Sequence, residues 1–128
     1  AQGALDKTVA YIRERSQFNA PLASFQGLQF KIADMTARVE AARLLYQKAA
    51  WLTDHGEVDR KLISTAKLVA GEAAVRVTDE AVQMHGGYGY MDEYDVQRFY
   101  RDAKIVEIYE GTKEIEKITI AREVLGKF

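Results

Sequence analysis

The sequence predicts an all-α fold, an antiparallel four-helix bundle of up-down-up-down topology with an additional short helix or turn. The chain has one proline and nine glycines, with long intervals between them. Within these intervals apolar residues recur three and four positions apart, the period of an amphipathic helix. No stretch sustains the alternation of apolar and polar residues that a half-buried strand needs. We expect residues 1–128 to form one domain of a longer protein, because the chain opens within a helical pattern.

The first predicted helix presents Leu5, Val9 and Ile12 on one face and ends near Arg15. Residues 19–21, with the sequence Asn-Ala-Pro, interrupt the helical pattern. Proline has no N–H to donate and restricts the backbone of the residue before it. We therefore expect a turn between the first helix and the second.

Two long helices are predicted next. The first of them follows Ser24, a good N-cap, and runs to Thr53, and Gly56 suits the left-handed position after a helix end. The second begins near Asp59 and stops at Gly86. Small residues on its face would let another helix approach closely, and we expect them to support self-association of the domain. These residues are Ala66, Ala70, Gly71, Ala73 and Ala74.

The remainder of the chain predicts a shorter helix around Phe99, an apolar connector at residues 105–109, and a last helix. Thr112 is the expected N-cap of that last helix, because its hydroxyl can accept a backbone N–H. Arg101 and Asp102 are expected to pair electrostatically and brace the turn that follows them.

Composition restricts the possible functions. Lys and Arg number 18 and Asp and Glu 19, so no excess positive charge suggests a nucleic-acid partner. Cysteine is absent, which excludes disulfides and thiolate catalysis in this chain but does not decide the compartment. No apolar run approaches the ~20 residues of a membrane-spanning helix. We expect a cytoplasmic protein if the source is bacterial or archaeal, and a mitochondrial matrix protein if it is eukaryotic.

Metal and dinucleotide sites are not expected. A di-iron bundle uses Glu-x-x-His pairs, but Leu52 and Val82 stand three residues before the two histidines, His55 and His85. The glycine-rich stretch 86–89 follows a helix rather than a strand and lacks the lysine–threonine pair of a phosphate-binding loop. The glycines are better suited to a helix end where another group approaches the backbone closely.

Glu110 is the candidate catalytic carboxylate. It stands between an apolar connector and Gly111, just ahead of the N-cap Thr112. A carboxylate held on a turn at the start of a helix can reach out of the apolar interior and act as a general base. Taken alone, residues 108–112 also fit an ordinary surface glutamate before a helix.

Four strings, in this order, resemble the C-terminal domain of the flavin-dependent acyl-CoA dehydrogenases, and the resemblance runs through essentially the whole chain. The strings are Glu14-Arg15-Ser16-Gln17-Phe18-Asn19, Gln83-Met84-His85-Gly86-Gly87-Tyr88-Gly89-Tyr90, Tyr100-Arg101-Asp102-Ala103-Lys104-Ile105 and Tyr109-Glu110-Gly111-Thr112. One departure is visible, since Glu116 and Lys117 stand where many relatives have glutamine and arginine.

The resemblance implies roles for individual residues. Glu110 would be the catalytic base, and Tyr109, Glu110 and Gly111 would contact the acyl-CoA substrate. The cofactor FAD would be contacted by two groups of residues, one of them reaching a flavin held mainly by a neighbouring subunit. The predicted FAD-binding residues are Arg15, Gln17, Phe18, Gln26, Gln83, Gly86, Gly87, Thr112 and Glu114.

The implied reaction is α,β-dehydrogenation of an acyl-CoA thioester in fatty acid or amino acid catabolism. An electron-transfer flavoprotein would accept the electrons, and the enzyme would be a homo-tetramer or dimer. The isolated fragment is expected to be inactive, because the family uses two further domains. Two alternatives stay open: a non-catalytic helical module used for oligomerisation, and the corresponding domain of an acyl-CoA oxidase.

Overall fold

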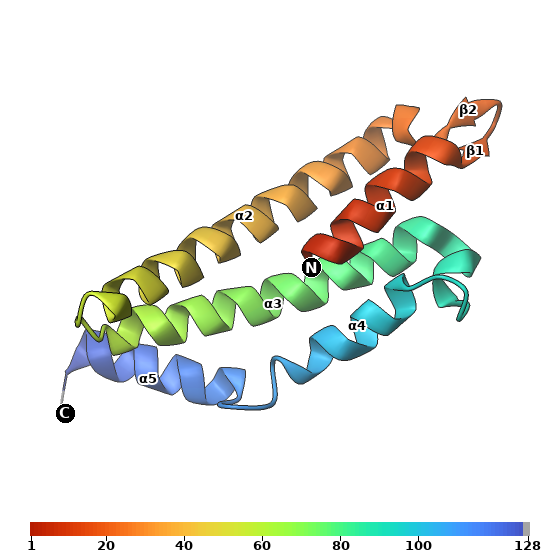
Figure 1. Ribbon diagram of the computed structural model, residues 1–128. Coiled ribbons are helices and arrows are strands. Elements are labelled where there is room, and N and C mark those ends of the chain that lie inside the picture. Colours follow the sequence, from red (N-terminus) through yellow and green to blue (C-terminus); the bar gives the residue numbers. More distant parts are fainter. Residues whose placement is uncertain (127–128) are drawn as a thin grey trace.

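The computed structural model describes residues 1–126 and confirms the all-α fold (Figure 1). Two short 3-10 helices and a two-stranded hairpin supplement five α-helices. The α-helices are α1 (Gln2–Glu14), α2 (Gln26–Asp54), α3 (Arg60–His85), α4 (Val96–Ile105) and α5 (Lys113–Leu125), and the 3-10 helices are η1 (Leu22–Ser24) and η2 (Gly86–Tyr90).

Helix α3 is the centre of the fold, because each of the other four α-helices contacts it. Helices α1, α2 and α3 run in alternating directions, and α4 followed by α5 returns along α3 (Figure 1). The up-down-up-down topology is therefore confirmed, with one addition: two shorter helices in succession fill the fourth position. The bent segment between them is the connector, which comprises residues 106–112 and so overlaps the apolar stretch 105–109.

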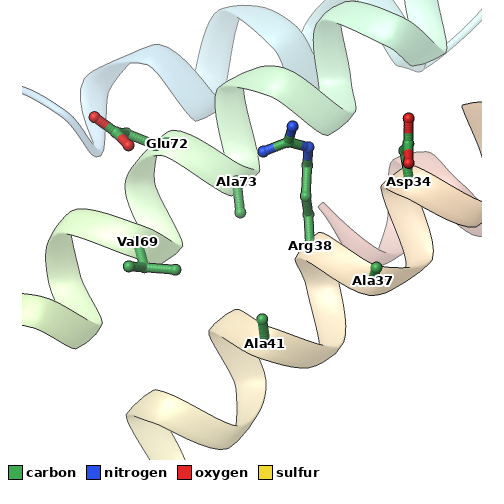
Figure 2. Close-up of a pocket in the computed structure, with 7 residues that line it drawn as sticks. All are labelled: Asp34, Ala37, Arg38, Ala41, Val69, Glu72 and Ala73. Atoms are coloured by element: carbon green, nitrogen blue, oxygen red, sulfur yellow. The ribbon is translucent and has the colours of Figure 1, made fainter.

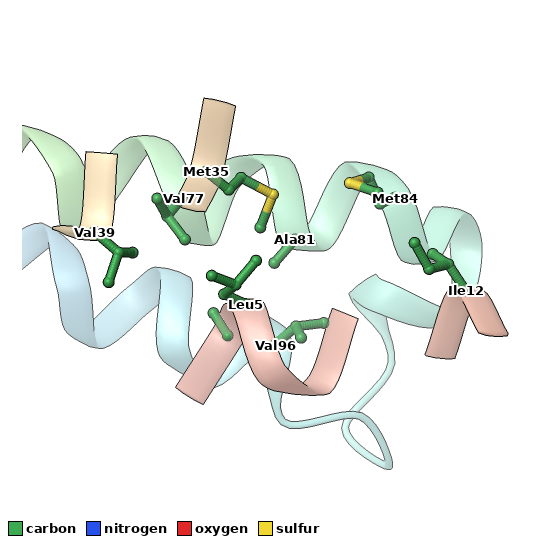
Figure 3. Close-up of a cluster of buried hydrophobic side chains, with 9 residues drawn as sticks. Leu5, Ile12, Met35, Val39, Val77, Ala81, Met84 and Val96 are labelled. Atoms are coloured by element: carbon green, nitrogen blue, oxygen red, sulfur yellow. The ribbon is translucent and has the colours of Figure 1, made fainter. Parts of the chain in front are cut away.

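The core lies where α1, α2, α3 and α4 meet (Figure 3). Met35, Val77 and Val96 come from three different helices and are almost completely buried. Full burial of one such side chain contributes about 1.5–3 kcal/mol. The buried hydroxyls of Thr8 and Thr78 donate to the carbonyls of the residues four positions earlier, both at 2.7 Å, so neither leaves an unsatisfied polar group in the core.

The ends of the helices test the predicted caps. Asp59 Oδ1 accepts the N–H of Leu62 at 2.9 Å and caps α3, and Gly56 adopts φ 81° after α2. The cap predicted at Ser24 is wrong. Ser24 ends η1 and donates its hydroxyl to the Pro21 carbonyl, so Phe25 becomes the N-cap of α2, without a side-chain cap hydrogen bond.

A small hairpin was not predicted from the sequence. Strands β1 (Ser16–Gln17) and β2 (Ala20–Pro21) pair in antiparallel fashion, with Ser16 opposite Pro21. The two residues of the turn, Phe18 and Asn19, have φ of 53° and 60°. Side chains rarely adopt this conformation, but two-residue hairpins require it. It places the Phe18 ring at the tip of the hairpin, where 89% of the residue is exposed.

Three of the five small residues of α3 pack within the chain, and the expected self-association stays a prediction. Ala66, Gly71 and Ala73 are buried, and a Cβ added to Gly71 would lie 3.7 Å from Glu107 and 3.8 Å from Val106. The connector, and not a second molecule, therefore packs against this glycine. Within residues 1–126, no helix is both long enough and apolar enough to cross a bilayer.

Candidate functional site

A groove of about 620 Å³ lies at the end of the bundle where α1 and α3 both terminate. It brings together five of the predicted cofactor-binding residues, although they come from two strings some seventy positions apart in the sequence. Those residues are Arg15, Gln17, Gln83, Gly86 and Gly87. Arginine and amide side chains beside exposed glycine backbone form a donor-rich surface, suited to an extended phosphate-containing ligand.

Arg15 is placed to bind an anion. Its guanidinium carbon lies 5.3 Å from the centre of the Tyr88 ring, so the aromatic face supports the cation at the groove. In the described part of the chain, no carboxylate forms an ion pair with it. A Cβ added at Gly86 or Gly87 would meet no atom within 4 Å, so a ligand can approach this backbone freely.

An aromatic wall lines the groove, and the sequence did not predict it. The rings of Tyr11 and His85 stack with their centres 4.1 Å apart, and the Tyr11 hydroxyl donates to the His85 carbonyl at 3.3 Å. Burial lowers the pKa of His85, although its hydrogen bond to the Ala81 carbonyl opposes this effect. His85 is therefore neutral at neutral pH, with Nδ1 as the natural proton bearer, and Arg15 remains the cation of the groove.

Two other predicted cofactor residues lie outside this groove. Phe18 is at the hairpin tip, and Gln26 is exposed at the first turn of α2. Neither lines the groove within this chain. Their roles stay predictions, and each needs a ligand that extends beyond the groove or comes from another molecule.

The connector presents Glu110 on an unusual turn. Glu110 has φ 52° and Gly111 φ 105°, so two consecutive residues are in the left-handed half of backbone space. Only the second of them is a glycine, and a glutamate in this region carries a conformational cost of about 1–2 kcal/mol. Glu110 is exposed, while Glu116, one turn into α5, is buried with a carboxylate oxygen close to Gly111. Glu110, unlike Glu116, is therefore open to solvent and accessible to a ligand.

Lysines hold the connector in place, and the sequence did not identify them. Lys67 of α3 donates to the carbonyls of Val106, Tyr109 and Gly111 at 3.1, 3.0 and 2.7 Å. Buried Glu107 pairs with Lys104 at 2.5 Å and with Lys113 at 3.8 Å. The ion pair expected between Arg101 and Asp102 is not among those of residues 1–126, so these lysines brace the turn instead. The only sequence signal was a lysine within the small-residue face of α3.

Thr112 and Glu114 act first as helix-capping groups. The Thr112 hydroxyl accepts the N–H of Ile115 at 3.4 Å, which confirms the predicted N-cap of α5. Hydrogen bonding to its own backbone N–H, with a contribution from the Thr112 hydroxyl, lowers the pKa of Glu114. This negative charge suits the positive end of the helix dipole. The cofactor contacts expected of both residues stay predictions.

The groove and the connector are distinct places on the domain. Lys67 contacts the connector and Gln83 lines the groove, and these two residues lie 16 positions apart on the same helix. At 1.5 Å per residue this is about 24 Å along α3. The predicted site residues therefore form two clusters, one at the end of the bundle and one on its flank.

A separate hollow, of about 350 Å³, lies between α2 and α3 (Figure 2). Arg38 extends between the two helices there, with Asp34 and Glu72 on either side. None of the predicted site residues lines it. Among residues 1–126, no three His, Asp or Glu side chains gather in a way that would hold a metal ion.

Residues 1–125 match the family described as acyl-CoA dehydrogenase, C-terminal domain. The chain is 52% identical over 125 residues to the probable acyl-CoA dehydrogenase YngJ of Bacillus subtilis, covering 98% of this chain and 33% of that protein. It is 54% identical over 127 residues to the acryloyl-CoA reductase (NADH) of Anaerotignum propionicum, covering 99% and 32%. It therefore spans about a third of the length of these relatives.

A solved structure gives the same result. The butyryl-CoA dehydrogenase of Megasphaera elsdenii superimposes with a TM-score of 0.96 at 47% identity, over 97% of this chain and 32% of that one.

Proposed function

Because the chain belongs to the acyl-CoA dehydrogenase family as its C-terminal domain, we propose that it supplies the catalytic base of a flavin-dependent acyl-CoA dehydrogenase. The full-length protein would remove one hydrogen each from the α- and β-carbons of an acyl-CoA thioester. The observation that carries this proposal is the placement of Glu110, exposed on a left-handed turn that the body of the bundle holds in place.

In this proposal the Glu110 carboxylate takes the α-proton of the thioester. The α-carbon is weakly acidic, so the negative charge that develops on the thioester oxygen needs a hydrogen-bond donor. In residues 1–126 the N–H of Glu110 donates to no backbone carbonyl, which leaves it available for this oxygen. Tyr109, half exposed beside Glu110, is placed to contact the acyl or thioester group. The base and a candidate oxyanion donor thus belong to one residue.

Membership in the family implies the cofactor FAD. The chemistry supplied by bound FAD would be that of a hydride acceptor for the β-hydrogen. The groove at the end of the bundle fits part of such a molecule, because it combines a supported arginine, two amide side chains and open glycine backbone. We assign Arg15 to the diphosphate and Gln17 and Gln83 to neighbouring polar groups.

Replacement of Arg15 by alanine is expected to weaken FAD retention by the full-length protein and to spare the chemistry in molecules that keep it. A guanidinium–phosphate contact is charge-assisted and bidentate, and its loss should raise the dissociation constant of FAD about tenfold or more. The measurement is FAD release during dilution or gel filtration, followed by fluorescence. Arg13→Ala, at an exposed position two residues earlier near the end of the same helix, is the control. Retention equal to wild type would remove Arg15 from the cofactor site.

We also propose that the full-length protein is a homodimer or homotetramer. The groove and the connector are about 24 Å apart along α3. We therefore expect them to contact two different flavins, one of them held by a neighbouring subunit. Several large apolar side chains on α2 and α5 are exposed in the single chain and are suited to an interface. Examples are Phe30, Leu44, Trp51, Val124 and Leu125.

The association prediction follows directly. The full-length protein is expected to sediment as a dimer or tetramer, and Leu44→Glu together with Trp51→Glu should lower the association constant at least tenfold, because charges cannot be buried unpaired in an interface. Analytical ultracentrifugation at micromolar concentrations measures this. A full-length protein that sediments as a clean monomer would contradict the proposal and leave the second flavin contact without a partner.

A second candidate function is the reverse reaction, reduction of an enoyl-CoA. It is favoured by one relative, the acryloyl-CoA reductase, which is 54% identical to this chain. In that direction Glu110 would donate the α-proton and the electrons would arrive through the flavin. Anaerobic bleaching of the yellow full-length protein by a saturated acyl-CoA supports dehydrogenation, whereas reoxidation of the reduced protein by an enoyl-CoA supports reduction. Electron-transfer flavoprotein is the proposed acceptor, and rapid oxygen consumption during turnover would indicate an oxidase instead.

A further inference from the structure

We propose that Lys67 is a positioning residue for Glu110: its ammonium group holds the turn that presents the carboxylate and polarises the peptide that precedes it. This inference rests on the proposed function of Glu110 as the base. It gives Lys67, a residue of α3 outside the proposed catalytic turn, an indirect role in the reaction.

The geometry at Lys67 is that of a filled donor set. The ammonium has three N–H groups, and it donates to three backbone carbonyls, those of Val106, Tyr109 and Gly111, at distances of 2.7–3.1 Å. Within residues 1–126 it forms no ion pair with a carboxylate. Its charge is directed entirely at the backbone of the connector, and the Tyr109 ring lies 5.8 Å from the same nitrogen.

Two of these carbonyls lie directly on either side of Glu110. The Tyr109 carbonyl belongs to the peptide before Glu110, and the Gly111 carbonyl follows the glycine after it. Glu110 itself has φ 52°, a conformation that a glutamate abandons unless its surroundings impose it. Because both neighbours are tied to one cation on the rigid central helix, the left-handed turn persists and the carboxylate stays where α5 begins.

The same contact changes the donor strength of the Glu110 N–H. That N–H and the Tyr109 carbonyl belong to one peptide group. Hydrogen bonding of the carbonyl to a cation draws electrons toward the oxygen and makes the N–H of the group a stronger donor. Since the N–H donates to no backbone carbonyl in the described part of the chain, this gain is available to the oxygen of a bound thioester.

The test uses the full-length flavoprotein in four forms: wild type, Lys67→Met, Lys61→Met and Glu110→Gln. Methionine keeps the length and apolar stem of lysine but removes the three donors. Lys61 is exposed on the same helix, and its side chain makes no hydrogen bond within residues 1–126, so it is the matched control. FAD content and the unfolding midpoint are measured first, and Lys67→Gln, which keeps a polar head group without the charge, replaces Lys67→Met if that variant does not fold.

The first measurement is local hydrogen exchange without acyl-CoA. The amides of Tyr109 and Lys113 are hydrogen-bonded across the connector, at 3.0 and 3.2 Å. We expect them to exchange about tenfold faster or more in Lys67→Met and at the wild-type rate in Lys61→Met. The second measurement is anaerobic flavin reduction at saturating acyl-CoA, where Lys67→Met should be about 10- to 100-fold slower, with the dissociation constant of acyl-CoA changed about threefold or less.

The outcomes separate the two proposals. Unchanged exchange in Lys67→Met would overturn the inference, as would faster exchange accompanied by reduction at the wild-type rate, because the lysine would then hold the loop without positioning the base. An equal loss of acyl-CoA affinity and reduction rate would also overturn it, since general loosening of the site explains that result. Reduction of Glu110→Gln at the wild-type rate would instead reject Glu110 as the base and, with it, the proposed function.

Discussion

Replacement of Glu110 by glutamine is expected to remove most acyl-CoA-dependent flavin reduction in the full-length protein while leaving FAD and acyl-CoA bound. The amide is nearly isosteric with the carboxylate, so binding contacts and the turn are preserved, but an amide cannot accept the α-proton. General-base catalysis contributes about 10²- to 10⁴-fold, and the loss can exceed this where no water replaces the base. Anaerobic stopped-flow reduction at saturating acyl-CoA is the measurement.

The control for this variant is Glu123→Gln, which changes an exposed carboxylate on α5. It should reduce its flavin at the wild-type rate. If Glu110→Gln also does so, the base lies on another residue, and the exposed left-handed turn at Glu110 must serve a different purpose.

Of the substitutions proposed for this protein, replacement of Gly89 by alanine is expected to lower the free energy of unfolding most. Gly89 is buried in η2, and an added Cβ would lie 2.5 Å from the Val82 carbonyl oxygen and 2.8 Å from His85 Cβ. Both atoms belong to the last turns of α3, which cannot move without breaking helix hydrogen bonds. Overpacking of this kind costs about 1–3 kcal/mol and sometimes more, and it would also shift His85 at the wall of the groove.

Chemical denaturation of the protein measures this effect, with Gly87→Ala as the matched control. Gly87 lies two residues earlier in the same 3-10 helix, its φ is not positive, and a Cβ there would meet nothing within 4 Å. Its free energy of unfolding should change by about 0.5 kcal/mol or less. A Gly89→Ala protein with the wild-type unfolding midpoint would show that α3 and η2 separate more easily than their contact implies.

Much of the fold was predictable from the sequence because it depends on local patterns. Apolar spacing predicted each α-helix, and Asp59 and Thr112 were identifiable as caps because a short oxygen-bearing side chain before a helix can accept a free N–H. Ser24 misled the prediction, since its hydroxyl has a closer partner in the Pro21 carbonyl. The hairpin at Ser16–Pro21 was missed because two-residue strands are too short to show a periodic pattern.

The candidate site divides in the same way. Glu110, Arg15 and Gln83 stood in strings that resembled a known family, and residue order alone was enough to recognise them. Lys67 stood in no such string. A lysine on a helix has the appearance of a solvated surface residue in the sequence, and its three carbonyl partners are 39 to 44 positions away.

The sequence by itself determined the helices, most of their ends, the family and the candidate base, because periodicity, capping and motif order are properties of neighbouring residues. Tertiary structure alone decided three other things: that α4 and α5 share the fourth position of the bundle, that Arg15 and Gln83 line one groove, and that Lys67 holds the turn at Glu110. Each depends on contacts between residues distant in the chain. Such contacts are fixed only when the other helices pack against α3 and its buried donors and acceptors must find partners.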